Sequence, residues 1–390
     1  MKRLAILGST GSVGIQTLEV ASAHPDEFEI VSLAASKRRD VLAGQCVRHR
    51  PRRVALADGA AARALADELR ATMGDEAPRV ESGPESASLL ATDPGVDVVV
   101  QAMSGAAGLP ASVAAVKSRK TVALANKESL VVAGELITRL AEETGATIVP
   151  IDSEHSAIFQ ALRAGRRSEV RRIVLTASGG PFLGLEDAEI ASSTPEAAVR
   201  HPRWDMGPRI SVDSATLVNK ALEIVEAKWL FGLEPRLIGV VIHPQSIVHS
   251  MVEFHDGSVV AQMGVPDMRV PIRFALSCPV RLEAPAPGFT AAAFDGLRFM
   301  EPDARCRRSL ALGYRAAEVG GTLGAALNAA DEVAVEAFLR REIPFTRILD
   351  VVEEVMDRHR SVPEKDIGTV LAADAAAREE ARALVARERR

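Results

Sequence analysis

The sequence predicts an α/β fold in three parts: an N-terminal parallel sheet with helices on both faces, a central α+β region and a C-terminal α-helical region. In the first 150 residues, short apolar runs alternate with amphipathic stretches, which is the pattern of βαβ units. After about residue 151 several strand-like runs follow a helix-like one, and after about residue 305 apolar residues recur at helical spacing. A chain of 390 residues also exceeds one ordinary core, so several domains are expected.

The N-terminal part contains six short apolar runs that we expect to be buried strands, because strands covered on both faces have continuous hydrophobic sequences. Amphipathic segments such as Val13–Ala23 and Val113–Ser118 lie between these runs and are expected to be helices. The expected strands are Leu4–Leu7, Glu29–Ala34, Arg53–Ala57, Val96–Gln101, Thr121–Ala125 and Thr147–Ile151.

The central part begins with a helix-like stretch, Ser156–Ala164, and contains a long irregular segment, 179–212, with glycines, prolines and a tryptophan. Long loops in compact domains are usually functional or disordered, so we expect a flexible loop at about 198–209. The strands expected in this part are Arg172–Ala177, Ile238–His243, Ser250–Glu253 and Ser258–Met263.

The C-terminal part follows a proline-rich stretch, 279–305, that indicates a linker. The helices expected after it are Cys306–Gly320, Thr322–Arg341, Pro344–His359 and Asp366–Arg387. We therefore divide the chain into domains at 1–150 and 151–285, a linker at 286–311 and a helical domain at 312–390.

Composition and charge exclude several classes of protein. A net charge of -5 argues against a dedicated nucleic-acid surface. Cys46, Cys278 and Cys306 lie far apart and without CxxC spacing, so neither a disulfide framework nor a zinc site is expected. No apolar run approaches the roughly 18 residues that a membrane span needs, and no targeting segment precedes the first apolar run. We expect a soluble, cytoplasmic protein without a nucleic-acid or membrane partner.

The turn after the first expected strand is rich in glycine and reads Gly8-Ser9-Thr10-Gly11-Ser12-Val13-Gly14. Glycines three apart permit a tight turn and let the backbone approach a pyrophosphate, which the following helix N-terminus attracts. The spacing differs from GxGxxG, and a plain structural turn is the alternative. Its position between a strand and a helix favours dinucleotide binding by a Rossmann-like sheet.

The end of the second expected strand distinguishes the two nicotinamide cofactors. NAD enzymes usually place Asp or Glu there for the ribose hydroxyl, whereas this chain has Ser36, Lys37 and Arg38. These three side chains can bind a 2′-phosphate that a carboxylate would repel. A solvated run of charges is the alternative, but the position after the second strand favours NADPH.

Polar residues also follow two later strands, at the carboxyl edge of the sheet where open α/β sheets bind ligands. Asn126-Lys127-Glu128 follows one strand, and Asp152-Ser153-Glu154 follows the next. Two carboxylates this close in sequence can offer oxygen ligands to one hard cation such as Mg²⁺ or Mn²⁺. A bland surface loop is the alternative for residues 126–128.

A third carboxylate for such a cation is Glu223, in the helix-like run Ser214–Phe231. Asn219, Lys220 and Glu223 are spaced three and four apart and so share one helix face. That face could bind substrate and metal. A surface ion pair between Lys220 and Glu223 is the alternative.

Further candidates lie in the central part. Ser178 precedes two glycines, and this arrangement can present hydroxyl and backbone N–H donors to a phosphate, although Ser-Gly-Gly is also a common turn. His201 and Trp204 lie in the long loop, and a tryptophan there suggests a lid that excludes water, with a core anchor as the alternative. His243 and His249, near strand ends, are interpreted as supporting residues.

Eight of these segments together resemble one known family. They occur in the order and approximate spacing of the deoxyxylulose phosphate reductoisomerases, from residue 1 to about 270, and the length and domain order agree beyond that point. The segments are Gly8–Gly14, Leu124–Ser129, Ile151–His155, Ser178–Phe182, His201–Gly207, Ser211–Thr216, Asn219–Glu223 and His243–Ser246.

The resemblance implies roles for individual residues. NADPH would be bound by Thr10, Gly11, Ser12, Val13, Ser36, Lys37, Arg38, Asn126, Glu128 and Gly207. Mg²⁺ or Mn²⁺, with Co²⁺ as a further candidate, would be bound by Asp152, Glu154 and Glu223. Substrate contacts and catalysis would involve Lys127, Ser153, Glu154, Ser178, His201, Trp204, Ser214, Asn219, Lys220 and Glu223.

The family pattern is not matched at every position. Ser36 stands where glycine is familiar, Arg209 replaces a usual lysine, and Leu217-Val218 replaces a methionine pair. Ala221 replaces glycine, and Asp331 stands where asparagine is usual. None of these positions is an expected metal ligand, but Ser36 bears on the cofactor phosphate and Arg209 on the loop.

The resemblance also implies the reaction and the assembly. Residues 1–150 would bind NADPH, and residues 151–285 would carry catalysis and dimerisation of a homodimer. The substrate would be 1-deoxy-D-xylulose 5-phosphate, rearranged by an α-ketol or a retro-aldol/aldol path and reduced to 2-C-methyl-D-erythritol 4-phosphate for isoprenoid precursors. A metal-free NADP-dependent dehydrogenase and a catalytically silent NADPH-binding protein are the rival interpretations.

Overall fold

The computed structural model describes residues 1–204, 206–284 and 288–388, which form two compact units. The first unit comprises Met1–Ser129, Ile137–Asp152 and Met268–Ala284. The second comprises Leu130–Leu136, Ser153–Asp267 and Pro285–Arg390. The expected functional domains have other bounds and stay a prediction. The expected flexible loop includes Asp205, and the linker includes residues 286 and 287, all of which lie outside the described residues.

A seven-stranded parallel sheet forms the centre of the first unit, which confirms the predicted fold class. Its strand order is β4-β3-β2-β1-β5-β6-β7, so the carboxyl ends of all strands meet at one edge. The strands are β1 (Lys2–Leu7), β2 (Phe28–Ala35), β3 (Arg53–Leu56), β4 (Arg79–Ser82), β5 (Val98–Gln101), β6 (Thr121–Leu124) and β7 (Thr147–Pro150).

Strand β4 was not expected from the sequence. It lies at the sheet edge and reads Arg-Val-Glu-Ser, without the apolar run that marks the central strands. Its Glu81 binds Arg53 of β3 at 2.8 Å, so a cross-strand ion pair accompanies the backbone pairing. Edge strands often carry charged side chains, which weakens their signal in sequence.

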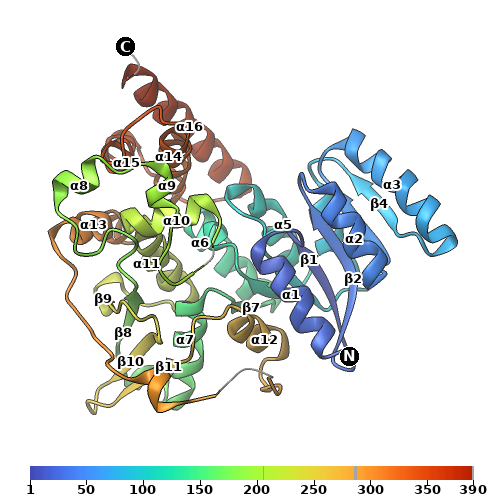
Figure 1. Cartoon of the computed structure of the whole chain (residues 1–390), viewed down its shortest axis with the longest axis horizontal. Helices are drawn as coiled ribbons and strands as arrows, with labels where there is room; N and C mark the ends of the chain where they lie inside the picture. Colours follow the sequence, from blue (N-terminus) through green and yellow to red (C-terminus); the bar gives the residue numbers. More distant parts are fainter. Residues whose placement is uncertain (205, 285–287, 389–390) are drawn as a thin grey trace. The chain divides into compact units, whose positions relative to one another are not determined.

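Helices surround this sheet, and α1 and α2 lie beside β1 and β2 in Figure 1. Helix α12 was not expected, and it packs against α1, β6 and β7. The Lys2 ammonium donates to the Leu276 carbonyl at 2.8 Å and so fastens α12 to the start of β1. The helices of this unit are α1 (Ser12–Ala23), α2 (Arg39–His49), α3 (Gly59–Met73), α4 (Ser86–Ala91), α5 (Leu109–Lys117), most of α6 (Lys127–Thr144) and α12 (Arg269–Ser277).

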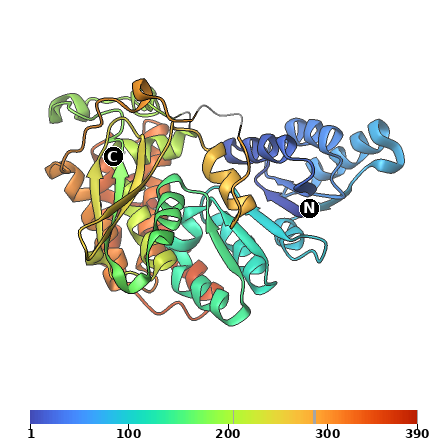
Figure 2. The ribbon, with the colours of Figure 1, turned by 90° about the horizontal axis from the view of Figure 1, so that it is seen from below.

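The second unit contains a four-stranded mixed sheet in the order β11-β10-β8-β9. β8 is parallel to β9 and antiparallel to β10, and β10 is antiparallel to β11. Helix α7 (Ser153–Ala161) packs against β10 and β11, and Figure 2 shows the green and yellow strands of this sheet side by side. The strands are β8 (Val170–Ala177), β9 (Ile238–Ile242), β10 (Val248–Phe254) and β11 (Val259–Met263).

The segment that was expected to be irregular, 179–212, contains two short helices and the start of a third. They are α8 (Asp187–Ala191), α9 (Pro195–Ala198) and α10 (Pro208–Thr216). Glu186 and Thr194 supply caps at the N-termini of α8 and α9, and proline opens α9 and α10. The prediction missed α8 and α9 because each is too short to show helical periodicity.

The expected helix-like run Ser214–Phe231 is also wrong at its start, because the helix is interrupted at Leu217. Leu217 has φ +64° and separates α10 from α11 (Val218–Phe231). The Thr216 hydroxyl accepts a hydrogen bond from the Val218 N–H at 3.2 Å, which supports the break. Ser214 therefore lies on α10, whereas Asn219, Lys220 and Glu223 lie on α11.

The last helices and the second sheet share one large apolar core. Helices α14, α15 and α16 pack together (Figure 1). Helix α13 begins inside the range expected to be a linker, because the Asp303 carboxylate accepts from the Cys306 N–H at 2.7 Å and caps it. The helices are α13 (Ala304–Val319), α14 (Leu323–Leu339), α15 (Arg347–Arg358) and α16 (Ile367–Glu388).

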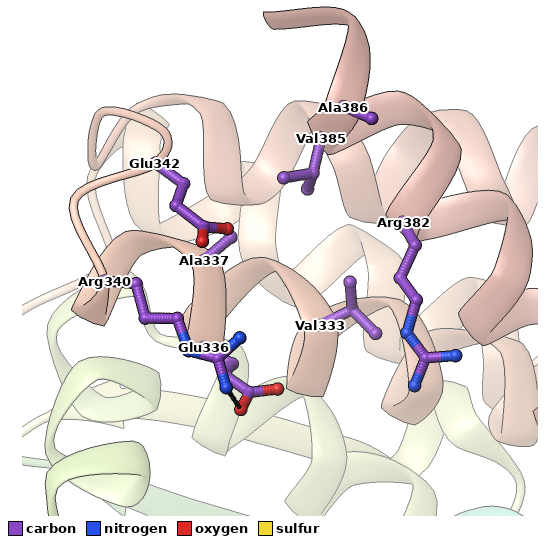
Figure 3. A pocket seen from close by; sticks show the side chains of 8 residues that line it. All are labelled: Val333, Glu336, Ala337, Arg340, Glu342, Arg382, Val385 and Ala386. Atoms are coloured by element: carbon purple, nitrogen blue, oxygen red, sulfur yellow. Dashed lines mark hydrogen bonds and ion pairs between the residues drawn. The ribbon is translucent and has the colours of Figure 1, made fainter. Parts of the chain in front are cut away.

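A cavity of about 290 Å³ lies between α14 and α16 (Figure 3). Apolar side chains such as Val333 and Val385 line it, and Glu336 and Arg340 pair with each other at its rim. None of the residues expected to bind cofactor, metal or substrate lines this cavity. Throughout the described ranges, every helix is either too short or too polar to span a bilayer.

We expect Gly313→Ala to destabilise the second unit. A Cβ at Gly313 of α13 would lie 2.6 Å from the Ala221 Cα, so α11 and α13 would have to separate. The free energy of unfolding should fall by about 1–3 kcal/mol in chemical denaturation. Gly44→Ala in α2 is the control, since its Cβ would meet no atom within 4 Å and should stabilise by about 0.5–1 kcal/mol. Equal effects of both substitutions would contradict this packing.

Candidate active site

The glycine-rich turn lies at the carboxyl edge of the first sheet, as expected. The N–H groups of Gly8 and Ser9 both donate to the Ala34 carbonyl at 2.9 Å, which ties the turn to β2. A Cβ at Gly14 would lie 2.6 Å from the Ser9 Cα, so only glycine allows α1 to start this close to the turn. Gly11 and Ser12 are exposed at the N-terminus of α1, where N–H groups can face an anion.

The basic cluster after β2 meets this turn. The Arg38 guanidinium donates to the Thr10 carbonyl at 2.8 Å, so the two segments expected to bind the dinucleotide are in direct contact. Ser36, Lys37 and Arg38 are all exposed. A phosphate bound by these side chains would therefore displace water from them, without breaking a buried contact within the protein.

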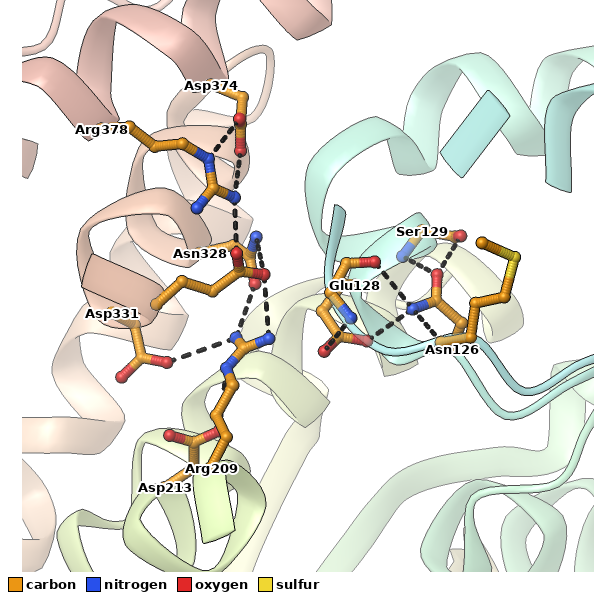
Figure 4. A network of polar contacts seen from close by, with 12 residues as sticks. Asn126, Glu128, Ser129, Arg209, Asp213, Asn328, Asp331, Asp374 and Arg378 are labelled. Atoms are coloured by element: carbon orange, nitrogen blue, oxygen red, sulfur yellow. Dashed lines mark hydrogen bonds and ion pairs between the residues drawn. The ribbon is translucent and has the colours of Figure 1, made fainter. Parts of the chain in front are cut away.

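Asn126 and Glu128 hold a loop of the same edge (Figure 4). The Asn126 amide nitrogen donates to the carbonyls of Met103 (2.8 Å) and Gly105 (3.0 Å) and to the Glu128 carboxylate (2.8 Å). Its amide oxygen accepts from the Ser129 N–H at 3.1 Å and caps α6, while Glu128 accepts from the Gly105 N–H at 3.0 Å. Asn126 is almost fully buried, so its side chain fixes the loop after β5.

Lys127 and Asp152 form a buried ion pair with Nζ–Oδ2 2.6 Å. Lys127 opens α6 after β6, and Asp152 follows β7, so the pair joins the ends of adjacent strands. Both belong to the expected substrate and metal residues. An ammonium and a carboxylate at the edge of a dinucleotide-type sheet can orient a polar substrate.

In the second unit, Lys220 lies between two carboxylates. Its ammonium is 2.7 Å from the Glu154 Oε1 and also pairs with Glu223, and the residue is 2% exposed. Burial disfavours the charged form, but Glu154 and Glu223 outweigh it and hold the pKa of Lys220 above its usual value. The alternative of a surface ion pair is therefore wrong, because α11 turns this face into the protein.

Hydrogen bonds orient both carboxylates of this cluster. Asn219 donates to the Glu223 Oε1 at 2.6 Å, and the Ser153 hydroxyl donates to Glu154. Glu154 and Glu223 each offer an oxygen within 4.8 Å of the other. These are hard oxygen donors of the kind that Mg²⁺ and Mn²⁺ prefer, so the cluster fits such an ion.

Asp152 is close to Glu154 through the chain itself. Only Ser153 separates the two residues, so their Cα atoms are at most about 7 Å apart. A third carboxylate is thus available on the segment that leads into α7.

Ser178, Ser214 and His201 come together around the Ser-Gly-Gly turn. A Cβ at Gly180 would lie 3.0 Å from the Ser214 carbonyl carbon, so this turn packs directly on α10. The Ser178 hydroxyl and the His201 Nε2 are hydrogen bonded at 2.9 Å. The His201 Nδ1 accepts from the Trp204 N–H at 3.0 Å, which places the remaining ring proton on Nε2 toward Ser178.

Burial sets the protonation of this histidine. It lowers the pKa of His201, against the opposing charge of Glu154. The Trp204 ring is half-buried and lies 6.2 Å from the His249 ring, centroid to centroid. Gly207 is exposed at the start of α10. Whether Trp204 belongs to a lid stays a prediction.

Two buried residues support the acidic cluster and were missed. The His155 Nε2 lies 3.0 Å from the Glu223 carbonyl, and its Nδ1 lies 3.5 Å from the Glu226 carboxylate. They join α7 to α11: His155 directly follows Glu154, and Glu226 lies about one turn after Glu223. Glu226 continues the three-residue spacing of Lys220 and Glu223 on α11, a signal that the sequence analysis did not use. His243 supports the turn after β9, where its Nδ1 donates to the Arg298 carbonyl at 2.7 Å.

The first unit is built as a dinucleotide-binding sheet, and the second gathers acidic, basic and hydroxyl side chains suited to a small charged molecule. Together they define an oxidoreductase that acts with a dinucleotide on such a substrate. Sequence models described as 1-deoxy-D-xylulose 5-phosphate reductoisomerase match residues 4–134 and, for its C-terminal domains, 148–231 and 263–380. The chain belongs to the family of 1-deoxy-D-xylulose 5-phosphate reductoisomerases.

Individual relatives cover nearly the whole chain. The 1-deoxy-D-xylulose 5-phosphate reductoisomerase of Symbiobacterium thermophilum is 49% identical over 381 residues, 98% of both chains. That of Anaeromyxobacter dehalogenans is also 49% identical and covers 98% of this chain and 96% of its own. The resemblance inferred from eight motifs is thereby confirmed.

Solved structures agree with this assignment. A crystal structure of DOX-P reductoisomerase in complex with NADPH, fosmidomycin and magnesium has a TM-score of 0.94 at 38% identity, covering 99% of this chain and 98% of that one. The Zymomonas mobilis 1-deoxy-D-xylulose 5-phosphate reductoisomerase in complex with NADPH has a TM-score of 0.90 at 39% identity, covering 98% of each chain. The predicted fold class is confirmed over 98–99% of the chain.

We expect Asn126→Asp to destabilise the first unit. The substitution replaces an N–H donor that faces two carbonyls and the Glu128 carboxylate by a charged acceptor. The free energy of unfolding at pH 8 should fall by roughly 2–4 kcal/mol. Gln16→Glu on α1, whose exposed amide donates to the Ser12 hydroxyl at 3.2 Å, is the control and should change it by less than about 0.5 kcal/mol. An Asn126→Asp protein as stable as the parent would show that the loop does not depend on this donor.

Proposed function

We propose that this chain converts 1-deoxy-D-xylulose 5-phosphate to 2-C-methyl-D-erythritol 4-phosphate with NADPH and a divalent cation, in the non-mevalonate route to isoprenoid precursors. The observation that carries the proposal is family membership along the whole chain. The cluster of Glu154, Lys220 and Glu223 supports it, because a silent binding protein would have no need to bury these charges together.

The cofactor is assigned to the carboxyl edge of the first sheet. Thr10, Gly11, Ser12 and Val13 would bind its pyrophosphate, and Ser36, Lys37 and Arg38 its 2′-phosphate. The contact between Arg38 and Thr10 supports this division of roles. Asn126 and Glu128 would act there by holding the loop after β5, and Gly207 would line the site from α10. NADPH in two of the similar structures agrees with the choice of cofactor.

The cation is assigned to Asp152, Glu154 and Glu223. When bound, a divalent cation supplies Lewis-acid polarisation of the substrate's ketone and neighbouring hydroxyl oxygens. The protein's own residues then orient the carboxylates: Asn219 and Lys220 hold Glu223, and Ser153 holds Glu154. Magnesium in similar structures supports Mg²⁺, and Mn²⁺ or Co²⁺ would suit the same oxygen donors.

The substrate is assigned to the polar groups around this cluster. Ser178, Ser214, Asn219 and Lys220 would hold the phosphate, and Lys127 and Ser153 would contact the carbon chain. His201 and Trp204, on the loop before α10, would cover the bound substrate and exclude water from it. Neutral His201 would present its Nε2 proton to Ser178, leaving the Ser178 hydroxyl hydrogen free to point at a phosphate oxygen.

A homodimer in the cytoplasm completes the proposal. Strand β11 is the last strand of its sheet, with Val259 55% and Met263 41% exposed. An exposed edge of this kind is suited to an interface between copies of the chain. Neither a membrane nor a nucleic acid is proposed as a partner.

The test is NADPH oxidation after addition of 1-deoxy-D-xylulose 5-phosphate and Mg²⁺ or Mn²⁺. We expect a chelator to abolish turnover and added cation to restore it, and Glu223→Gln to lower turnover about 100-fold or more without rescue. Glu318→Gln, an exposed carboxylate on α13, is the control and should leave turnover unchanged. Turnover that survives the chelator would favour a simple dehydrogenase, and no turnover at all would favour a silent binding protein.

A further inference from the structure

Helix α10 is fastened to α14 by a largely buried group of polar and charged side chains, which we call the α10 clamp (Figure 4). The clamp consists of Arg209 and Asp213 on α10 and Asn328, Asp331 and Glu332 on α14. The Arg209 guanidinium lies 2.8 Å from the Glu332 Oε1, 3.0 Å from the Asn328 Oδ1 and 3.4 Å from the Asp331 Oδ2. Its Nε lies 3.6 Å from the Asp213 Oδ2.

One partly buried guanidinium thus faces three carboxylates. Asp331 is fully buried and Asp213 nearly so. Removing such charges from water costs several kcal/mol per ion unless the partners are placed well, so α10 has few alternative positions on α14. A second guanidinium, Arg378 of α16, is 2.6 Å from the other oxygen of Glu332 and also binds Asp374, and neither of these two carboxylates lies on α10.

Helix α10 connects the clamp to the groups assigned to the substrate phosphate. Arg209 is in its first turn, Ser214 is in its last, and the break at Leu217 leads directly into Asn219 and Lys220 of α11. The Ser-Gly-Gly turn packs on Ser214 with no space for a Cβ at Gly180. A shift of α10 would therefore move Ser214 relative to Ser178 and to the first turn of α11.

We propose that the α10 clamp positions the phosphate-binding groups, with Arg209 and Asp331 acting through Ser214 as positioning residues. The proposal rests on the proposed function for the identity of the ligand, a sugar phosphate. It assigns a role in substrate binding to side chains of the C-terminal helices that do not reach the substrate.

The test compares two arginines of the same network. Arg209→Met removes the guanidinium that holds α10, whereas Arg378→Met removes one that holds only α14 to α16. Their side chains are 24% and 20% exposed, so the two substitutions are matched in burial. We expect Arg209→Met to raise KM for 1-deoxy-D-xylulose 5-phosphate about tenfold with kcat lowered at most about threefold, and Arg378→Met to leave KM within about twofold. Arg209→Lys should give an intermediate KM, and it replaces Arg209→Met in the comparison if the methionine variant does not fold.

Amide hydrogen exchange of residues 208–216 gives a readout that does not depend on turnover. Exchange should be faster in Arg209→Met than in Arg378→Met. Equal KM values and equal exchange in the two variants would overturn the proposal. If the parent protein does not turn over the substrate, the proposed function fails, while unequal exchange would still support the clamp.

The charge balance of the clamp predicts a pH dependence. Burial raises the pKa of Asp331 to about 6, against the lowering effect of Arg209. The charged groups that face Asp331 are Arg209 and Asp213 of α10 and Glu332 of its own helix. On α16, Arg378 forms ion pairs with Glu332 and with Asp374, so these two charges act on Asp331 indirectly. The usual pKa is 3.8, so between about pH 4 and 6 the folded chain keeps a proton that the unfolded chain has released.

Stability should therefore fall as pH rises through that window, with the unfolding constant increasing up to about tenfold per pH unit from this group. Asp331→Asn keeps an oxygen for Arg209 and offers a permanent N–H in place of the proton. We expect the free energy of unfolding of this variant, measured by urea titration between pH 4 and 7, to lack the fall with rising pH that Asp331 causes in the parent. A pH dependence identical to that of the parent would contradict the charge balance of the clamp.

Discussion

A buried ammonium group requires anionic partners, and this requirement shapes the second unit. Lys220 would be destabilising in the interior without Glu154 and Glu223, since an unpaired charge there costs several kcal/mol. To bring those carboxylates to one point, α7 and α11 must pack in one register. His155 joins the same two helices behind the cluster. The polar site thus helps to specify how α7 packs against α11, together with the apolar core of the second unit.

Much of the fold could be predicted because its signals are local. The apolar runs at β1, β2 and β5 and the helical periodicity of α13–α16 depend on neighbours in sequence, and the structure confirms them. The polar edge strand β4 and the short helices α8 and α9 carry no such signal. Leu217 was missed for a related reason: leucine is an ordinary helix former, and only its surroundings hold it at positive φ.

The candidate site also contains residues that local sequence reveals and contacts that it does not. Asn219, Lys220 and Glu223 share a helix face that spacing alone reveals, and their burial could not be read from that spacing. Asn126 was recognised by its position after β6, but its partners Met103 and Gly105 come from another loop. The clamp joins residues more than 100 positions apart, and no pattern in the sequence pairs Arg209 with Asp331. Contacts of this range depend on the assembled fold.

The break at Leu217 also links the active site to a small core elsewhere in the second unit. The Leu217 side chain packs with Ala177, Ile242 and Cys306, at the ends of β8 and β9 and in α13. A left-handed leucine is strained by about 1–2 kcal/mol, and these contacts offset that strain. The angle between α10 and α11 therefore depends on apolar residues outside the groups proposed to bind substrate. During evolution, drift in this small core can therefore move Ser214 relative to the first turn of α11 without any change among the residues proposed to bind substrate.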